Sequence, residues 1–185
     1  NGERFPLTIV DSDSAEGSLT LIVQEVGLST QLLCQMTAGQ TLSDIVGPLG
    51  HPAEIAHFGN CICVGGGIGV APLYPIAKAL KEVGNKITII IGARTKELVV
   101  LEREMRAVSD DIHLTTDDGS YGDKGFVSDK LRSLITAGRK FDFAAVIGPV
   151  PMMRVTCNVT KEFGIKTIVS LNPIMVDGTG MCGGC

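Results

Sequence analysis

The chain has 185 residues, of which 44% are hydrophobic and 19% are charged, and its formal net charge is −4. An apolar fraction of this size excludes intrinsic disorder and is sufficient for a buried core. The negative charge and the aromatic content of only 4% argue against a nucleic-acid-binding surface, so we expect no nucleic-acid partner.

Residues 1–57 are predicted to form a small β domain of short strands and turns. Strands are expected at Pro6–Val10, Ser18–Glu25 and Asp44–Leu49, with a short helix near Ser29–Met36. Short strands separated by such turns are typical of a β-barrel or another small all-β unit.

Residues 58–171 alternate between apolar runs and helical patterns. The predicted strands are Cys61–Val64, Lys86–Gly92, Ile112–Thr115, Phe143–Ile147 and Ile165–Ser170. The predicted helices between them are Ala71–Val83, Leu98–Val108, Phe126–Ala137 and Pro151–Phe163. Because the strand patterns are continuously apolar, both faces of each strand are expected to be buried. The sequence therefore predicts an α/β domain with a five-stranded parallel, doubly wound sheet.

One uncharged stretch, residues 55–77, is long enough to span a bilayer. Its five glycines and two prolines favour a strand, a turn and a helix start over a membrane helix. No signal peptide is recognisable, and the six cysteines do not form the pattern of a secreted disulfide framework. We therefore expect a cytoplasmic protein with no membrane partner. The missing initial methionine and the terminal cysteine suggest a fragment of a longer protein.

A glycine-rich motif, V-G-G-G-I-G-V-A-P, follows the first strand of the predicted sheet. Glycines allow backbone N–H groups to approach a phosphate closely, and a helix start favours negative charge. The residues expected at a dinucleotide are Gly65, Gly66, Gly67, Gly69, Ala71 and Pro72. A tight turn without a ligand is the alternative.

Three further loops follow strands of the sheet, at the edge where ligands bind in this architecture. They contribute the candidate cofactor-binding residues Arg94, Thr95, Asp118, Gly148, Pro149 and Met152. An acidic residue near the adenosine ribose would favour a free 2′-hydroxyl, and a basic residue would favour a 2′-phosphate. Arg94, Lys96 and Glu97 together give no clear preference. Ordinary solvated turns are the alternative for each loop.

Residues 172–185 have no periodic pattern and end in C-G-G-C. The spacing of Cys182 and Cys185 is that of iron or zinc ligands. If Asp177 is included, the pattern D-x4-C-x2-C mimics the plant-type cluster loop. A zinc knuckle or a redox-active pair remains an alternative. Since no Ser-His-Asp or paired-carboxylate arrangement is readable, we expect no catalytic side chain and chemistry that cofactors carry.

Together, the small β domain, the motif G-G-G-x-G-x-A-P and the motif G-P-x-x-M resemble the ferredoxin–NADP reductase-like flavoprotein superfamily. The segment Ser170–Cys185 narrows the resemblance to the small, FAD-containing subunit of NADH-dependent ferredoxin:NADP oxidoreductase, also called sulfide dehydrogenase. The electron-transfer subunit of dihydroorotate dehydrogenase is a near relative of that family. The resemblance covers essentially the whole chain.

The resemblance implies that FAD binds the first domain and NAD(P)H the second. In the superfamily an R-x-Y-S/T signature cradles the flavin, and R-F-P-L-T stands at that place here. The implied flavin-binding residues are Arg4, Pro6, Leu7, Thr8, Gly27, Ser29 and Thr30. Leu7 replaces the usual aromatic residue, and Ile147 stands where the C-G-P-x-x-M motif has its cysteine.

A [2Fe–2S] cluster in the tail is also implied by the resemblance. In this subfamily an aspartate replaces the first cluster cysteine, which assigns Asp177, Cys182 and Cys185 as three of four ligands. The fourth cysteine is expected beyond residue 185, and the first barrel strands before Asn1. The implied domains are a partial FAD-binding β-barrel (1–57), an NAD(P)-binding α/β domain (58–171) and the start of a cluster-binding segment (172–185).

The expected function is that of an NAD(P)H-dependent flavin oxidoreductase subunit in electron transfer. Hydride passes from NAD(P)H to FAD, and electrons continue to the [2Fe–2S] cluster and a larger flavin/iron–sulfur oxidoreductase subunit, with ferredoxin as a further candidate partner. The alternatives are an electron-transfer subunit of dihydroorotate dehydrogenase or hydrogenase, and a non-catalytic nucleotide-binding module whose C-x-x-C binds zinc.

Overall fold

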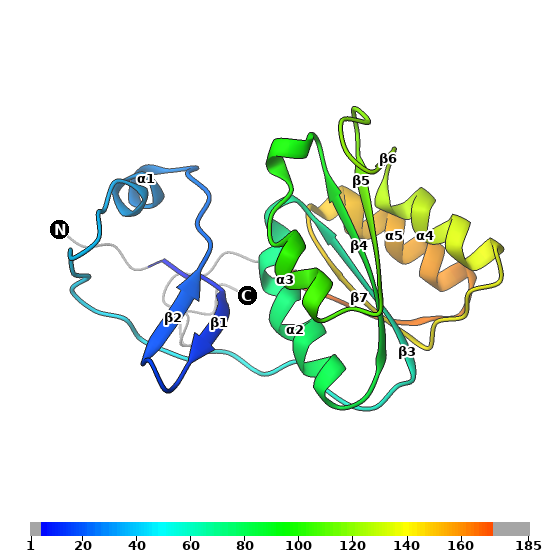
Figure 1. Cartoon of the computed structure of the whole chain (residues 1–185), viewed down its shortest axis with the longest axis horizontal. Coiled ribbons are helices and arrows are strands. Elements are labelled where there is room, and N and C mark those ends of the chain that lie inside the picture. Colours follow the sequence, from blue (N-terminus) through cyan, green and yellow to red (C-terminus); the bar gives the residue numbers. More distant parts are fainter. Residues whose placement is uncertain (1–4, 172–185) are drawn as a thin grey trace. The chain divides into compact units, whose positions relative to one another are not determined.

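The computed structural model describes residues 5–171, which divide into two compact units, residues 5–53 and 54–171 (Figure 1). None of the helices in residues 5–171 combines the length and the apolar character that crossing a membrane requires. The boundary lies at residues 53/54 instead of the expected 57/58. The reason is that the segment after Ala53 is bound to the second unit, for example by the ion pair of 3.1 Å between Glu54 and Lys166.

The first unit contains an antiparallel hairpin of β1 (Ile9–Asp13) and β2 (Ser18–Leu21), followed by the short helix α1 (Leu28–Cys34). The strand expected at Asp44–Leu49 was wrong, because the structure has no strand there. Pro48 lacks the N–H that a strand ladder needs, and the side chain of Ile45 is 65% exposed.

The second unit is built on a six-stranded, fully parallel sheet with the order β6-β5-β4-β3-β7-β8. Its strands are β3 (Asn60–Gly66), β4 (Lys86–Ala93), β5 (Asp111–Thr116), β6 (Asp123–Lys124), β7 (Phe143–Ile147) and β8 (Lys166–Val169). The parallel doubly wound sheet is thus confirmed, and β6 adds a sixth strand to the five expected. A strand of two residues is too short to produce a periodic pattern.

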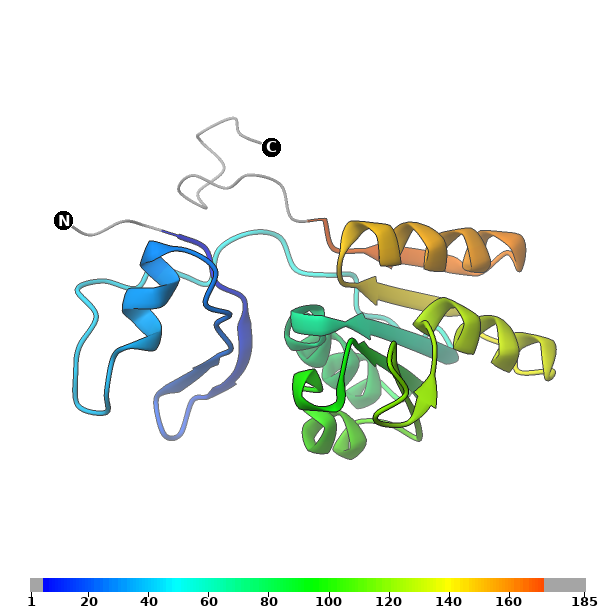
Figure 2. The same cartoon turned by 90° about the horizontal axis from the view of Figure 1, so that it is seen from above.

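Helices cover both faces of this sheet. Figure 2 shows α4 (Val127–Thr136) and α5 (Val150–Glu162) on one face and α2 (Val70–Glu82) and α3 (Glu102–Ala107) on the other. The helix expected at Leu98–Val108 is shorter, because a 3₁₀ turn, η2 (Lys96–Leu98), and Leu101 with a φ of 57° precede α3. A left-handed residue cannot continue an α-helix, so α3 begins only after it.

Fully buried strand side chains pack against buried helix side chains to form the core on both faces of the sheet. Ile62, Val64 and Ile90 pack with residues of α4 and α5 on one face. The opposite pleat of β3 places Cys61 and Cys63 in the interior, both with no exposed surface. Burial raises the pKa of the Cys61 thiol to about 11, with the negative charge of Asp142 as a second cause. These thiols are therefore protonated and unreactive at neutral pH.

A buried amide fixes the segment that enters the sheet. The Asn85 side chain is 2% exposed, and its oxygen accepts hydrogen bonds from the backbone N–H groups of Phe58 at 2.7 Å and Gly59 at 2.9 Å. Its Nδ2 donates to the carbonyl oxygens of Ala56 and Leu80, both at 2.8 Å. One side chain thus satisfies four backbone groups that water does not reach easily.

We predict that Asn85→Ala lowers the free energy of unfolding by about 3 kcal/mol, because it leaves several backbone groups unpaired at a cost of about 1–3 kcal/mol each. Urea denaturation of the 185-residue chain, followed by circular dichroism, measures this change. Asn158→Ala, at an exposed position of α5, is the control and should change stability by less than about 0.5 kcal/mol. Equal stability of the two variants would contradict the assigned role.

Candidate functional site

The order of the strands creates a switch point between β3 and β7. From β3 the chain builds the sheet in one direction through β4, β5 and β6, and then returns to place β7 on the other side of β3. In open α/β sheets, ligands bind in the crevice outside the carboxyl ends of the strands at such a point. The glycine-rich motif follows β3 and the Gly148–Met152 segment follows β7, so both predicted loops lie at the carboxyl ends of these two neighbouring strands, a region called the crevice below.

Two glycines of the motif serve close packing within the protein. A Cβ atom at Gly65 would lie 3.0 Å from side-chain atoms of Val70 and Leu73, and at Gly69 it would lie 2.6 Å from the carbonyl oxygen of Ile147. A side chain at Gly69 would therefore force the start of α2 away from the end of β7, and one at Gly65 would need Val70 and Leu73 to give way by a few tenths of an ångström. Ala71 is 3% exposed and belongs to the same packing layer.

Gly67 differs from its neighbours because its missing side chain would point into open space. Its φ is 55°, and among residues 5–171, apart from Gly67 and its two chain neighbours, no atom lies within 4 Å of the position a Cβ would take. The residue opens a 3₁₀ turn, η1 (Gly67–Gly69), which leads directly into α2. The backbone at Gly67 is therefore the part of the motif that a ligand can approach.

The two helices that start at the crevice, α2 and α5, share an electrostatic feature. Neither has an acidic residue in its first turn or a side-chain cap on its N-terminal N–H groups. The other two helices of this unit carry Glu102, Glu104 and Asp129 in their first turns. The uncompensated positive ends of α2 and α5 are thus suited to an anion such as a pyrophosphate. Pro72 is in the first turn of α2, where its missing N–H costs no helical hydrogen bond.

The loops after β4 and β5 are joined by hydrogen bonds. The N–H of Lys96 donates to the Ser120 hydroxyl at 2.9 Å, which donates to Oδ1 of Asp118 at 2.7 Å. The N–H of Asp118 also donates to the carbonyl oxygen of Arg94 at 3.4 Å. The hydrogen bonds from the backbone N–H and the hydroxyl of Ser120 lower the pKa of Asp118. The predicted residues Arg94 and Asp118 are therefore brought together.

The charges on these loops have opposite signs and lie at the surface. Arg94, Lys96 and Glu97 are exposed. A hydrogen bond with the Thr95 hydroxyl is the largest cause that lowers the pKa of Glu97. The Lys96 ammonium lies 5.4 Å from the centre of the Tyr121 ring, a cation–π distance. The loop after β4 can thus present either the carboxylate of Glu97 or the guanidinium of Arg94 to a ribose.

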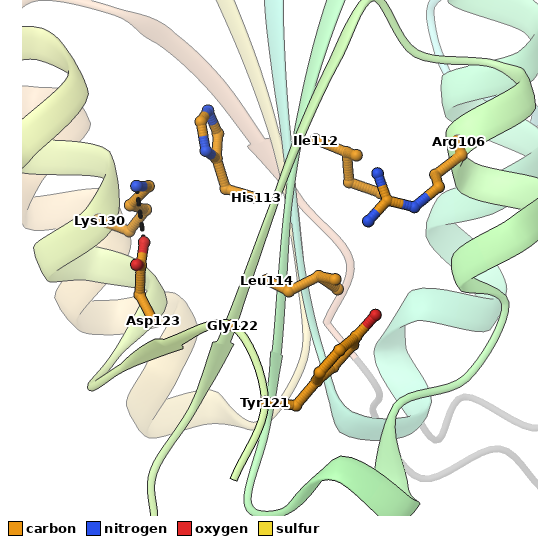
Figure 3. Close-up of a pocket in the computed structure, with 8 residues that line it drawn as sticks. All are labelled: Arg106, Ile112, His113, Leu114, Tyr121, Gly122, Asp123 and Lys130. Carbon is orange, nitrogen blue, oxygen red and sulfur yellow. Dashed lines mark hydrogen bonds and ion pairs between the residues drawn. The ribbon is translucent and has the colours of Figure 1, made fainter. Parts of the chain in front are cut away.

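A shallow pocket of about 400 Å³ lies away from the crevice, at the β5–β6 edge (Figure 3). Its lining consists of Arg106, Ile112, His113, Leu114, Tyr121, Gly122, Asp123 and Lys130. Figure 3 shows that β5 separates His113 and Lys130 from Arg106 and Tyr121. Carboxylates already pair with its basic side chains, Arg106 with Glu102 and Lys130 with Asp123, both at 2.7 Å. This pocket is a charged sheet edge and is separate from the β3–β7 crevice.

One residue near the site was not predicted from the sequence. Phe126 is 62% exposed and directly precedes α4, after the β5 and β6 carboxyl ends. The next residue, Val127, is buried against the sheet, where a Cβ at Gly92 would come within 2.5 Å of it. The sequence placed Phe126 inside a helical pattern, so its exposure on the ligand side of the sheet had no visible signal.

The residues that the resemblance assigned to flavin lie in the first unit. Pro6 and Thr8 are exposed and Leu7 is partly buried, directly before β1. The Thr30 hydroxyl accepts hydrogen bonds of 3.0 Å from the N–H groups of Val26 and Gly27 and donates to the Gly27 carbonyl at 2.9 Å. Thr30 therefore organises the turn that starts α1. Arg4 lies outside the described residues.

The predicted cluster ligands Asp177, Cys182 and Cys185 also lie outside the described residues. Within residues 5–171, no three histidine, cysteine or acidic side chains are grouped as a metal site would require. The cysteines of this range, Cys34, Cys61, Cys63 and Cys157, are all free thiols.

Comparisons with known proteins identify the family. Residues 63–158 match the model of the oxidoreductase NAD-binding domain. The chain is 39% identical over 188 residues to the dihydroorotate dehydrogenase B (NAD(+)) electron transfer subunit of Bacillus caldolyticus, covering 98% of the chain and 69% of the relative. The chain belongs to the family of dihydroorotate dehydrogenase B electron transfer subunits. A homolog of that subunit in Thermotoga maritima is 51% identical over 184 residues, covering 100% of the chain and 64% of the relative.

A solved structure from a study of NADH-dependent reduced ferredoxin-NADP oxidoreductase has the same fold as this family member. The identity is 49% and the TM-score 0.93, and the match covers 100% of this chain and 66% of that chain. The chain thus spans about two thirds of the length of the relatives that it matches. The resemblance to the ferredoxin–NADP reductase-like superfamily is confirmed.

Proposed function

We propose that this chain is the NAD(P)H- and FAD-binding part of an electron-transfer flavoprotein subunit. The observation that carries the proposal is the crevice at the β3–β7 switch point, where Gly67 is open and the first turns of α2 and α5 lack acidic residues. This arrangement suits a dinucleotide pyrophosphate. The names of the relatives, which are oxidoreductases and electron transfer subunits, agree with it.

The chain's own residues bind and orient in this proposal, and none acts as an acid or a base. The backbone at Gly67 and the amino end of α2 hold the pyrophosphate, while the Gly148–Pro149 turn borders the nicotinamide end. The loops that contain Arg94, Thr95 and Asp118 hold the adenosine ribose, and exposed Phe126 offers an aromatic surface to the adenine. Hydride transfer depends on such positioning more than on proton transfer.

The first unit would hold the flavin through Thr8 and the Gly27–Thr30 turn. The exposure of Thr8 and Gly27 and the ordered start of α1 are compatible with this role. Bound FAD supplies the conversion between two-electron hydride chemistry and single-electron transfer. We infer FAD in preference to FMN, because the Gly27–Thr30 segment offers a helix start to a pyrophosphate.

Gly67→Val is expected to weaken NADH binding at least about tenfold (about 1.4 kcal/mol) while flavin stays bound, because the valine side chain fills the space that the ligand needs. Isothermal titration calorimetry with NADH measures the change. Gly164→Val is a matched control, because Gly164 also has a positive φ, 67°, and open surroundings. It lies between α5 and β8, at the amino end of β8, whereas the crevice lies at the carboxyl ends of the strands. Unchanged NADH affinity in Gly67→Val would refute the assigned crevice.

NADH is expected to be preferred to NADPH. The family resemblance and Glu97 motivate this expectation, and the relatives' names include NAD(+), whereas Arg94 and Lys96 oppose it. Steady-state diaphorase rates with each nucleotide decide the question, and Arg94→Ala should reduce only the residual rate with NADPH. A clear preference for NADPH in the unmodified protein would overturn the assignment.

We further propose that electrons leave through a [2Fe–2S] cluster to a larger flavin/iron–sulfur oxidoreductase subunit, with ferredoxin as a further partner. Asp177, Cys182 and Cys185 are the proposed ligands in this chain, and thiolates are the usual donors to such clusters. The support is the D-x4-C-x2-C spacing and the relatives' description as electron transfer subunits.

In a protein as long as its relatives, Cys182→Ser should remove most of the iron and Asp177→Ala should make the cluster labile. Asp177→Cys should retain the cluster with a shifted potential, because thiolate is a softer donor than carboxylate. Iron analysis and the EPR signal of the reduced protein measure these effects. If Asp177→Ala keeps the iron content, spectrum and potential of the parent, Asp177 is not a ligand; zinc in place of iron would favour the zinc-binding alternative.

A further inference from the structure

The side chain of Met152 occupies a slot between the two loops that form the crevice. A Cβ atom at Gly66, the last residue of β3, would collide with the Met152 sulfur. A Cβ at Gly148, directly after β7, would lie 3.0 Å from the same sulfur and 2.8 Å from the terminal methyl carbon. The same Cβ would lie 3.2 Å from the backbone nitrogen of Gly66, so the two loops are neighbours with the thioether against both.

Neither glycine is required by its backbone conformation. Gly66 has a φ of −128°, and Gly148 is not among the glycines with positive φ. An alanine could adopt both conformations, so the need for glycine comes from space. The ring Cδ of Pro149 would lie 3.5 Å from a Cβ at Gly66, which is an ordinary contact. The Met152 sulfur, at the far end of a flexible side chain, is therefore the atom that a side chain at Gly66 would displace.

Met152 also connects the crevice to the core. It lies in the first turn of α5, is partly buried, and packs against the cluster that contains Val64 and Val146 of the two central strands. A thioether chain is unbranched and adapts to a narrow slot, whereas a branched side chain would need more width. One flexible side chain thus lies between the core and the floor of the crevice.

We propose that Met152 is a positioning residue that sets the spacing between the glycine-rich loop and the turn after β7. This inference rests on the proposed binding of a nicotinamide dinucleotide in that crevice. In this role the thioether holds the two loops at the distance that the dinucleotide needs. Removing it lets the loops close or shift, and adding a methyl group at Gly66 pushes it out of the slot. Both changes weaken nucleotide binding through the same contact.

A double-mutant cycle between Gly66→Ala and Met152→Ala tests the proposal in the flavin-loaded protein. We expect each single variant to raise the dissociation constant for NADH at least about tenfold, with kcat at saturating NADH within about twofold of the parent. Because the new methyl group occupies part of the space that the thioether leaves, the double variant should bind NADH at least about threefold better than either single variant. Such recovery is the mark of two residues that share one contact.

Gly66→Ala with Met153→Ala is the control pair. Met153 is the neighbouring methionine, 4% exposed in the core, and its atoms are not among those nearest to the Cβ position of Gly66. The effects of this pair on NADH binding should therefore multiply. If the effects of Gly66→Ala and Met152→Ala also multiply, Met152 does not act as the spacer.

Unfolding free energies of the same variants separate this inference from the proposed function. The contact is internal to the protein, so Gly66→Ala and Met152→Ala should be non-additive in stability even without a nucleotide. If the parent protein does not bind NADH but the stabilities are coupled, the proposed function fails and the spacer contact stands. If Gly66→Ala does not fold, the double variant should recover folded protein; a double variant that also fails to fold contradicts the proposal.

Discussion

Backbone contact between the start of α2 and the end of β7 is the constraint on which the candidate site depends. A Cβ at Gly69 would lie 2.6 Å from the Ile147 carbonyl oxygen and 2.7 Å from Cα of Gly148. Such an approach is open only to glycine. Because β7 is the neighbour of β3 in the sheet, this contact brings the amino ends of α2 and α5 to the same crevice. The suitability of the proposed site for an anion follows from that meeting.

The glycines of the motif have different physical roles, although the sequence presents them as one pattern. Gly65 and Gly69 allow α2 to pack on the sheet, Gly66 makes room for Met152, and Gly67 leaves its backbone open to a ligand. Most of the motif is thus used to build the floor of the crevice.

The distribution of charge around the sheet supports the same interpretation. The helices α3 and α4, which do not follow β3 or β7, begin with acidic residues such as Glu102 and Asp129, which compensate their own dipoles. The two helices at the crevice do not, so their positive ends remain available. The β5–β6 edge has basic residues as well, but carboxylates such as Glu102 and Asp123 already neutralise them. The positive helix ends at the crevice are thus uncompensated, whereas the basic side chains of the β5–β6 edge are paired.

The sequence alone determined the order of strands and helices in residues 58–171 and the position of the glycine motif between a strand and a helix. Both signals are local, since they depend on periodic burial and on glycine spacing. It misassigned Asp44–Leu49 because apolar residues beside a proline resemble an edge strand. Only the tertiary structure decided which glycine is open, that Met152 touches Gly66, and that Phe126 is exposed. These properties arise from contacts between loops that are distant in the chain, and no local pattern encodes them.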